Sequence, residues 1–225
     1  MPNNTNKAKN KMGIRVLIAD DHAVVREGLS GLLQAELELE VVGLARDGRE
    51  AVRRAIELRP DVVVMDIAMP ELNGIEATRE IRKACESTRV VILSMYATSQ
   101  HVHGAVRAGA DGYVVKGGET IEIVEAIRAV HNGKRYVCKK ITNSVASEFL
   151  NGGHSKSPLE LLSSRERQML QHIVEGKTSA EIASTFSLSV KTIETYRSRM
   201  MRKLDICDLP SLVKFAIRHG ISSLD

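Results

Sequence analysis

Five short apolar runs, each followed by an amphipathic stretch with helical spacing, constrain the fold of this chain more than any other feature. The runs occupy residues 16–19, 41–45, 62–65, 90–94 and 112–116. Strands that alternate with helices form a parallel sheet, because each crossover helix carries the chain back to the same end of the sheet. The sequence therefore predicts a three-layer α/β domain with a parallel five-stranded sheet over residues 14–135.

Composition and the N-terminus exclude several classes of protein. A chain of 225 residues has room for one large domain or two ordinary ones. Its hydrophobic content of 43% is enough to form hydrophobic cores. The three cysteines lie far apart and predict neither a disulfide framework nor a zinc site. Since no apolar run reaches the roughly 18 residues of a membrane span and no signal peptide is evident, we expect a cytoplasmic protein with a disordered tail at residues 1–13.

Polar side chains follow four of the five predicted strands. Parallel strands place their carboxyl ends at one edge of a sheet, so these side chains should meet there. Three carboxylates brought together repel each other, and a hard divalent cation such as Mg²⁺ offsets that repulsion. One carboxylate could then act as a nucleophile toward a phosphoryl group while an amine and a hydroxyl contact its oxygens. The side chains concerned are Asp20, Asp21, Asp66, Ser94 and Lys116.

Four motifs at these strand ends resemble the receiver domains of two-component response regulators, which have a flavodoxin-like fold. The motifs are IADDH (18–22), MDIAMPELNG (65–74), ILSMYA (92–97) and AGADGYVVKG (108–117). The resemblance implies that Asp66 is the phospho-acceptor and that Ser94, Tyr113 and Lys116 are the hydroxyl switch, the aromatic switch and the phosphoryl-binding lysine. It implies a Mg²⁺ site made by Asp20, Asp21, Asp66 and the backbone carbonyl of Ala68.

Two positions depart from the receiver pattern. Gly117 follows the lysine where many receivers have proline, so a cis peptide bond is not assumed there. Ala68 is small and apolar where many receivers carry a larger side chain, so we expect it to leave the attacking water unpositioned. A phospho-Asp66 half-life unchanged by Ala68→Asn would contradict this expectation.

A second domain follows a segment with weaker structural signals. Residues 136–158 are predicted to form a linker with one short helix near 141–150, ending in a cluster of glycines and a proline. Residues 159–225 then contain two helix-start signals, Ser163 with Glu166 and Thr178 with Glu181, each a capping box. Together with two later helices they predict a small all-α domain of four helices.

The third of these helices, at residues 190–204, is both amphipathic and basic. An apolar stripe, expected to pack inward, is formed by Val190, Ile193, Met200 and Leu204. Residues 191–203 also contain five basic residues and only one acidic residue. Such a pattern predicts a helix-turn-helix whose second helix enters the major groove of DNA. A helical protein-interaction module is the alternative on charge and periodicity alone.

The stretch from LLSSRERQMLQHIVEG to YRSRMMRKLDI resembles the LuxR-type helix-turn-helix domain over residues 159–224, with the motif itself at 179–198. The pairing of this domain with a receiver resembles the NarL/FixJ group of transcription factors. The resemblance places Glu194, Thr195 and Ser198 at base edges. It places Lys191, Thr192, Arg197 and Arg199 at phosphates.

The two resemblances together imply a regulator of transcription and not an enzyme. A sensor histidine kinase would supply the phosphoryl group. Phosphorylation would release the DNA-binding domain, promote a homodimer that binds double-stranded DNA, or do both. A regulator whose receiver pocket is unused is the alternative. An aspartate-dependent phosphohydrolase is disfavoured because Ala68 offers no general acid two residues after Asp66.

Overall fold

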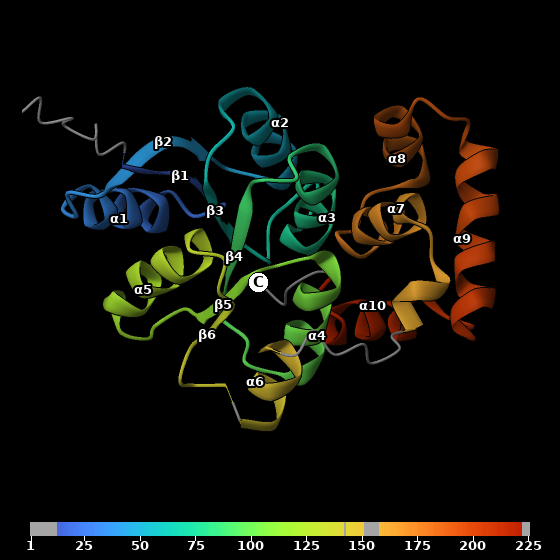
Figure 1. Cartoon of the computed structure of the whole chain (residues 1–225). Coiled ribbons are helices and arrows are strands. Elements are labelled where there is room, and N and C mark those ends of the chain that lie inside the picture. The colour runs from blue at the N-terminus through green and yellow to red at the C-terminus, as the bar shows by residue number, and fades with distance from the viewer. Residues whose placement is uncertain (1–12, 142, 151–157, 222–225) are drawn as a thin grey trace, which may run out of the picture.

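The computed structural model describes residues 13–141, 143–150 and 158–221. The tail expected at residues 1–13 lies outside this description except for Gly13, as do residues 151–157 of the expected linker. The described chain forms an N-terminal α/β part and a C-terminal helical part, each with its own hydrophobic core (Figure 1). None of the described helices is long and apolar enough to cross a membrane.

The N-terminal part is a parallel sheet between two layers of helices, as predicted. The strand order is β2-β1-β3-β4-β5-β6, with α1 and α5 on one face and α2, α3 and α4 on the other (Figure 1). The strands are β1 (Ile14–Ala19), β2 (Leu39–Ala45), β3 (Val62–Asp66), β4 (Arg89–Ser94), β5 (Gly112–Val115) and β6 (Tyr136–Val137). The helices are α1 (Ala23–Gln34), α2 (Gly48–Leu58), α3 (Gly74–Ala84), α4 (Ser99–Ala108) and α5 (Thr120–His131).

The strand order explains why polar side chains meet at one edge. All five residues of β3 are buried, and β3 lies between β1 and β4. Ala19 pairs with Met65, and Asp66 pairs with Leu93. The ends of these strands are therefore level, and Asp20, Asp66 and Ser94 leave the sheet side by side.

The sheet has one strand more than the sequence predicted. β6 extends β5 by pairing Tyr136 with Gly112 and Val137 with Tyr113. Two residues carry no detectable alternation of apolar and polar side chains, so no sequence pattern marks this strand. The same segment, expected to be a linker, also contains α6 (Asn143–Leu150), close to the short helix predicted there.

The C-terminal part consists of a short 3₁₀ turn (Pro158–Leu161) and four helices: α7 (Ser164–Val174), α8 (Ser179–Phe186), α9 (Val190–Leu204) and α10 (Leu209–Arg218). Both predicted capping boxes are present, at Ser163 and Thr178. Ile193 and Met200 are fully buried, as expected of the α9 stripe. Val190 is 47% exposed, so its predicted burial is wrong: it is the first residue of α9, where the helix is not yet covered by its neighbours.

Candidate functional site

The carboxylate of Asp66 lies in a buried ionic cluster at the carboxyl edge of the sheet. Asp66 is 3% exposed, and the Lys116 Nζ lies 2.8 Å from its Oδ2 and 2.7 Å from Asp20 Oδ2. Burial raises the pKa of Asp66 to about 6, and Lys116 opposes this shift only in part. Burial alone would lower the pKa of Lys116, but the two carboxylates raise it overall. Near neutral pH the pair is therefore ionised, with Asp66 available as an oxygen nucleophile.

Asp21 completes an acidic group whose chemistry fits a divalent cation. Ligand atoms of Asp20, Asp21, His22 and Asp66 lie within 4.8 Å of one another. Three carboxylates beside a single ammonium leave two uncompensated negative charges. Among the described residues, the buried Oδ1 of Asp21 lies 2.8 Å from His22 Nδ1 but has no donor aligned for a hydrogen bond. A cation with oxygen preference, such as Mg²⁺, suits both the charge and this unsatisfied oxygen.

Ser94 and Tyr113 act on the same short segment after β4. Ser94, the last residue of β4, accepts a hydrogen bond at its Oγ from the backbone N–H of Tyr96 (3.1 Å). The hydroxyl of the fully buried Tyr113 donates to the carbonyl of Tyr96 (2.7 Å). Both backbone groups of Tyr96 are therefore held by the two residues that the sequence singled out, although Tyr96 itself was not predicted.

Tyr96 connects this pocket to the C-terminal domain, because it contacts His101 of α4 and His101 contacts Gly220. The two rings stack with centroids 4.8 Å apart, and the Thr98 hydroxyl lies 2.6 Å from His101 Nδ1. Gly220 lies directly against His101: a Cβ on Gly220 would lie 2.6 Å from the ring, and its φ of +68° also favours glycine. Burial lowers the pKa of His101 to about 4, with a smaller contribution from His219.

The loop after Asp66 makes a second connection to the same domain. Gly74, where α3 begins, lies so close to Asp66 that a Cβ would be 1.9 Å from the Asp66 carbonyl oxygen. Gln171 of α7 spans this loop: its Oε1 accepts from the backbone N–H of Asn73 (2.8 Å), and its Nε2 donates to the carbonyl of Met69 (2.9 Å). The side chain of one residue in α7 therefore holds the loop that begins at Asp66.

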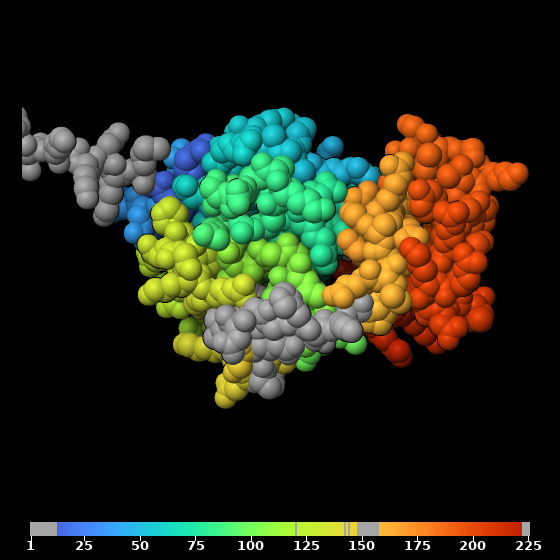
Figure 2. Space-filling view, turned by 45° about the vertical axis from the view of Figure 1, so that its right-hand side comes forward, coloured from blue at the N-terminus to red at the C-terminus, as the bar shows by residue number. Residues whose placement is uncertain are grey.

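Oppositely charged side chains line the contact between α3 and α7. Arg167 donates to both carboxylate oxygens of the buried Glu76, at 2.6 and 3.2 Å. Figure 2 shows the α3 region (green) directly against the α7 region (light orange). Two further pairs flank it, Lys177 with Glu71 at 2.7 Å and Gln168 with Glu80 at 2.8 Å. In all three contacts the acidic side chain belongs to the α/β domain, and the donor, which is Arg167, Lys177 or the neutral Gln168, belongs to the helical domain.

The predicted DNA-reading face of α9 is open to solvent. Figure 1 shows α9 on the side of the helical domain away from the sheet. Lys191, Glu194, Thr195, Ser198 and Arg199 are exposed and line shallow hollows along one side of α9.

The two remaining predicted contacts are less exposed. Thr192 is half-buried at the start of α9, where its N–H donates to Ser189 Oγ at 3.1 Å, although it lines one of the hollows. Arg197 is half-buried and is not among the residues that line them.

Sequence reasoning found the pocket but missed the residues that connect it to the helical domain. Asn73, Tyr96 and Gln171 lie within the motifs that carry the two resemblances, but none of them was predicted to have a role, and neither were Glu76 and His101. Only Asn73 carried a signal, since an Asn before a helical stretch is a common N-cap, and its Oδ1 does accept from Glu76 N at 3.0 Å. Contacts between domains follow no periodic pattern and are invisible in one sequence.

Each of the two domains matches a known protein family. Residues 16–128 match the response regulator receiver domain, and residues 160–216 match the bacterial regulatory proteins of the luxR family. The fold and the pocket thus define a two-component response regulator with a helix-turn-helix output domain, which is a class of DNA-binding transcription regulators and not of enzymes.

Full-length relatives narrow this class. The chain is 38% identical over 214 residues to the oxygen regulatory protein NreC of Staphylococcus haemolyticus and 37% identical over 208 residues to the transcriptional regulatory protein LiaR of Bacillus subtilis. Both alignments cover 92% of this chain and 99% of the relative. The protein belongs to the NarL/FixJ family of response regulators.

Solved structures agree with this assignment. A LuxR-family two-component response regulator from Aurantimonas sp. SI85-9A1 is 40% identical, with a TM-score of 0.58 over 60% of this chain and 97% of that one. A structure of two RcsB dimers bound to two parallel DNAs is 25% identical, with a TM-score of 0.55 over 90% of this chain and 97% of that one.

Proposed function

We propose that a sensor histidine kinase transfers a phosphoryl group to Asp66 and that this event controls how the protein binds DNA. The observation that carries the proposal is the ion pair at 2.8 Å between the buried Asp66 and Lys116, beside two further carboxylates. Asp66 is a buried nucleophile at the carboxyl ends of the strands, and the Lys116 ammonium beside it can contact an incoming phosphoryl oxygen. This arrangement is suited to that transfer. We place this reaction in the cytoplasm, where a kinase and DNA are both accessible.

The transfer exchanges one bond to phosphorus for another. An Asp66 carboxylate oxygen forms the new P–O bond, the P–N bond of the phosphohistidine breaks, and the departing imidazole takes up a proton. Lys116 pairs with the phosphoryl oxygens as the negative charge on Asp66 grows. Asp20, Asp21, Asp66 and the Ala68 carbonyl would hold a Mg²⁺ ion, which when bound supplies positive charge to the phosphoryl oxygens.

Two routes support communication between the phosphorylated pocket and the helical domain. One runs through the loop from Asp66 to Gln171, and the other through Ser94, Tyr96 and His101 to Gly220. The Ser94 hydroxyl accepts a hydrogen bond from the backbone N–H of Tyr96. If a phosphoryl group on Asp66 draws this hydroxyl toward itself, that hydrogen bond is weakened or lost. Phosphorylation would then favour one of two arrangements of the domains that already exist in equilibrium.

Because the face of α9 proposed to contact DNA is already exposed, docking of the two domains does not by itself prevent DNA binding. In the docked arrangement the face bearing Lys191 and Thr195 is already exposed, so docking does not hide the DNA-reading surface. We infer that phosphorylation acts on the arrangement of two copies, which would then read paired half-sites about one helical turn apart. The RcsB dimers seen on DNA, at 25% identity, support this proposal. Light scattering with and without a phosphoryl mimic tests it, and an unchanged mass would overturn it.

The proposed roles on DNA follow position and exposure on α9. Glu194, Thr195 and Ser198 would read base edges, and a carboxylate can accept from the cytosine amine. Lys191, Thr192, Arg197 and Arg199 would contact phosphates, although the partial burial of Arg197 makes it the weakest member of this set.

The phosphoryl transfer is tested by intact-mass spectrometry of the whole protein after incubation with Mg²⁺ and a small acyl phosphate. We expect a single phosphoryl adduct on the wild type and none on Asp66→Ala or in a metal-free sample. No adduct in any sample of folded protein would favour the alternative, a regulator that binds DNA with an unused receiver pocket.

A further inference from the structure

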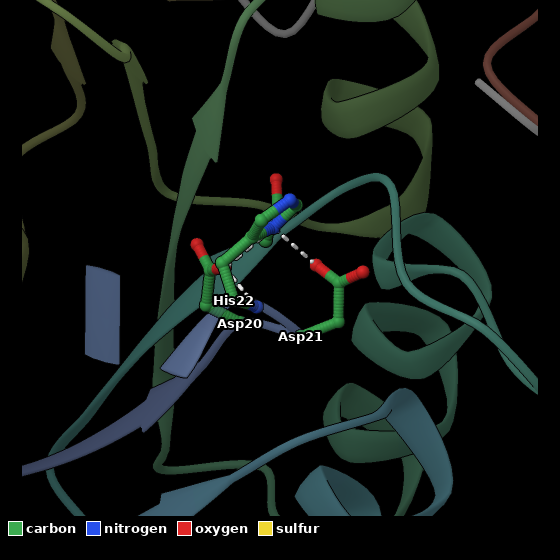
Figure 3. Close-up of side chains that lie close together, drawn as sticks. Asp20, Asp21 and His22 are labelled. Atoms are coloured by element: carbon green, nitrogen blue, oxygen red, sulfur yellow. Dashed lines mark hydrogen bonds and ion pairs between the residues drawn. The ribbon is translucent and has the colours of Figure 1, made fainter. Parts of the chain in front are cut away.

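His22 extends the acidic pocket with a nitrogen atom. Its Nδ1 lies 2.8 Å from Asp21 Oδ1 and 3.4 Å from Asp20 Oδ1, and Figure 3 shows its ring beside both carboxylates. The side chain of His22 is 59% exposed, so an ion can reach it from solvent. The pocket therefore contains imidazole nitrogen as well as carboxylate oxygen.

Capping of α1 does not account for the orientation of the His22 ring. His22 is the N-cap residue of α1, but its ring accepts no hydrogen bond from the described first turn of that helix. Its backbone N–H donates to Asp20 Oδ1 at 2.9 Å, and any residue other than proline could do this. The ring is thus not required to begin α1, and it faces the two carboxylates.

The spacing of these atoms matches that of neighbouring ligands around one transition-metal ion. Two ligands about 2.1 Å from a shared ion, at tetrahedral or octahedral angles, are about 3.0–3.4 Å apart. Of the two separations from His22 Nδ1, the 3.4 Å to Asp20 Oδ1 lies at the upper end of this range and the 2.8 Å to Asp21 Oδ1 lies just below it. Mg²⁺ takes oxygen ligands, whereas imidazole suits zinc, cobalt and nickel.

We propose that His22, Asp20 and Asp21 form a mixed nitrogen and oxygen site that binds a borderline divalent transition metal, represented by Zn²⁺, through His22 Nδ1. The proposal rests on the acidic pocket assigned above and adds a second class of ion to it. His22 selects between the classes: it strengthens binding of Zn²⁺ and leaves binding of Mg²⁺ to the carboxylates. The receiver thereby acquires a response to transition metals.

The test is calorimetric titration of the full-length wild type, His22→Gln and His131→Gln with Mg²⁺ and with Zn²⁺. His131 is an exposed histidine at the end of α5, so its variant controls for loss of an imidazole elsewhere. We expect His22→Gln to weaken Zn²⁺ binding about tenfold or more while Mg²⁺ binding stays within about twofold. Nitrogen NMR of ¹⁵N-histidine-labelled protein should show a Zn²⁺-dependent shift of His22 Nδ1.

The possible outcomes separate this proposal from the proposed function. Equal Zn²⁺ affinity of the wild type and His22→Gln, or an unshifted His22 Nδ1, would overturn the mixed site while leaving Mg²⁺ binding intact. Zn²⁺ binding that depends on His22, without any Mg²⁺ binding, would support the mixed site and count against Mg²⁺ as the ion for phosphoryl transfer.

Discussion

Arg167 of α7 donates two hydrogen bonds to Glu76 of α3, so the most buried ionic contact between the two domains is a bidentate pair. Arg167 also donates to the carbonyls of Leu162 (2.6 Å) and Leu159 (3.4 Å) within its own domain. The guanidinium is therefore fixed by the helical domain before it meets the receiver, where Glu76 also pairs with Arg79 of its own helix at 3.3 Å.

Glu76→Gln is expected to weaken docking of the domains by on the order of 3 kcal/mol, because it leaves the Arg167 charge buried without its counter-ion. The internal bonds of Arg167 remain, so both domains should stay folded. Small-angle X-ray scattering should show a larger radius of gyration than in the wild type. Glu86→Gln, an exposed acid beyond the end of α3, is the matched control, and equal radii for both variants would contradict the prediction.

Gln171→Leu is expected to change the lifetime of phospho-Asp66 several-fold, because leucine cannot bond Met69 and Asn73 and the loop that begins at Asp66 is then no longer held in place. The lifetime is measured from the decay of the phosphoryl adduct by mass spectrometry. Gln168→Leu is the control, since Gln168 bonds Glu80 of α3 and not the loop between Asp66 and Gly74. Equal effects of the two changes would show that general undocking, and not the loop, is responsible.

His101 should make the protein less stable in mild acid. The unfolded chain protonates this histidine below about pH 6.5, whereas burial lowers its folded-state pKa to about 4. Between these values the unfolded state binds more protons, so the free energy of unfolding falls as the pH falls. From pH 7.5 to 5.0 His101 should contribute a loss of about 2 kcal/mol, part of which Asp66 offsets because its pKa is raised to about 6 in the folded state.

Urea unfolding followed by circular dichroism measures this loss. Between pH 7.5 and 5.0, His101→Gln should lose about 2 kcal/mol less than the wild type, while His131→Gln, at an exposed position, should behave as the wild type does. The same acid sensitivity in His101→Gln as in the wild type would assign the effect to other groups, such as His219, whose pKa is also lowered by burial.

On α9, Lys191→Ala and Glu194→Ala should have different consequences for DNA binding. Loss of a phosphate contact weakens binding to all sequences and lowers the salt slope by about 1. Loss of Glu194 should relax base preference, and it also removes the bond from Ser179 Oγ to Glu194 Oε1. Selection from a random DNA library, followed by anisotropy titrations over a salt series, distinguishes the two. A change of base preference in Lys191→Ala alone would reverse the assignment.

Sequence alone determined the alternation of the first five strands with helices, the residues expected in the pocket, and the helical output domain. The parallel sheet follows from apolar runs that stop at Asp20, Asp66 and Ser94, because a strand covered on both faces must be apolar until it reaches the edge. The capping boxes at Ser163 and Thr178 follow from local hydrogen bonding over three residues. Such features depend on neighbours in sequence, and a single chain displays them.

Tertiary structure alone decided how the two domains communicate. Gln171 lies 98 residues from Asn73 along the chain, and Gly220 meets His101 across the domain boundary. The direction of the His22 ring and the exposure of Val190 also depend on what packs nearby, not on the residue type. Contacts of this kind arise from the docking of complete surfaces, whose shape and charge are set only after each domain has folded.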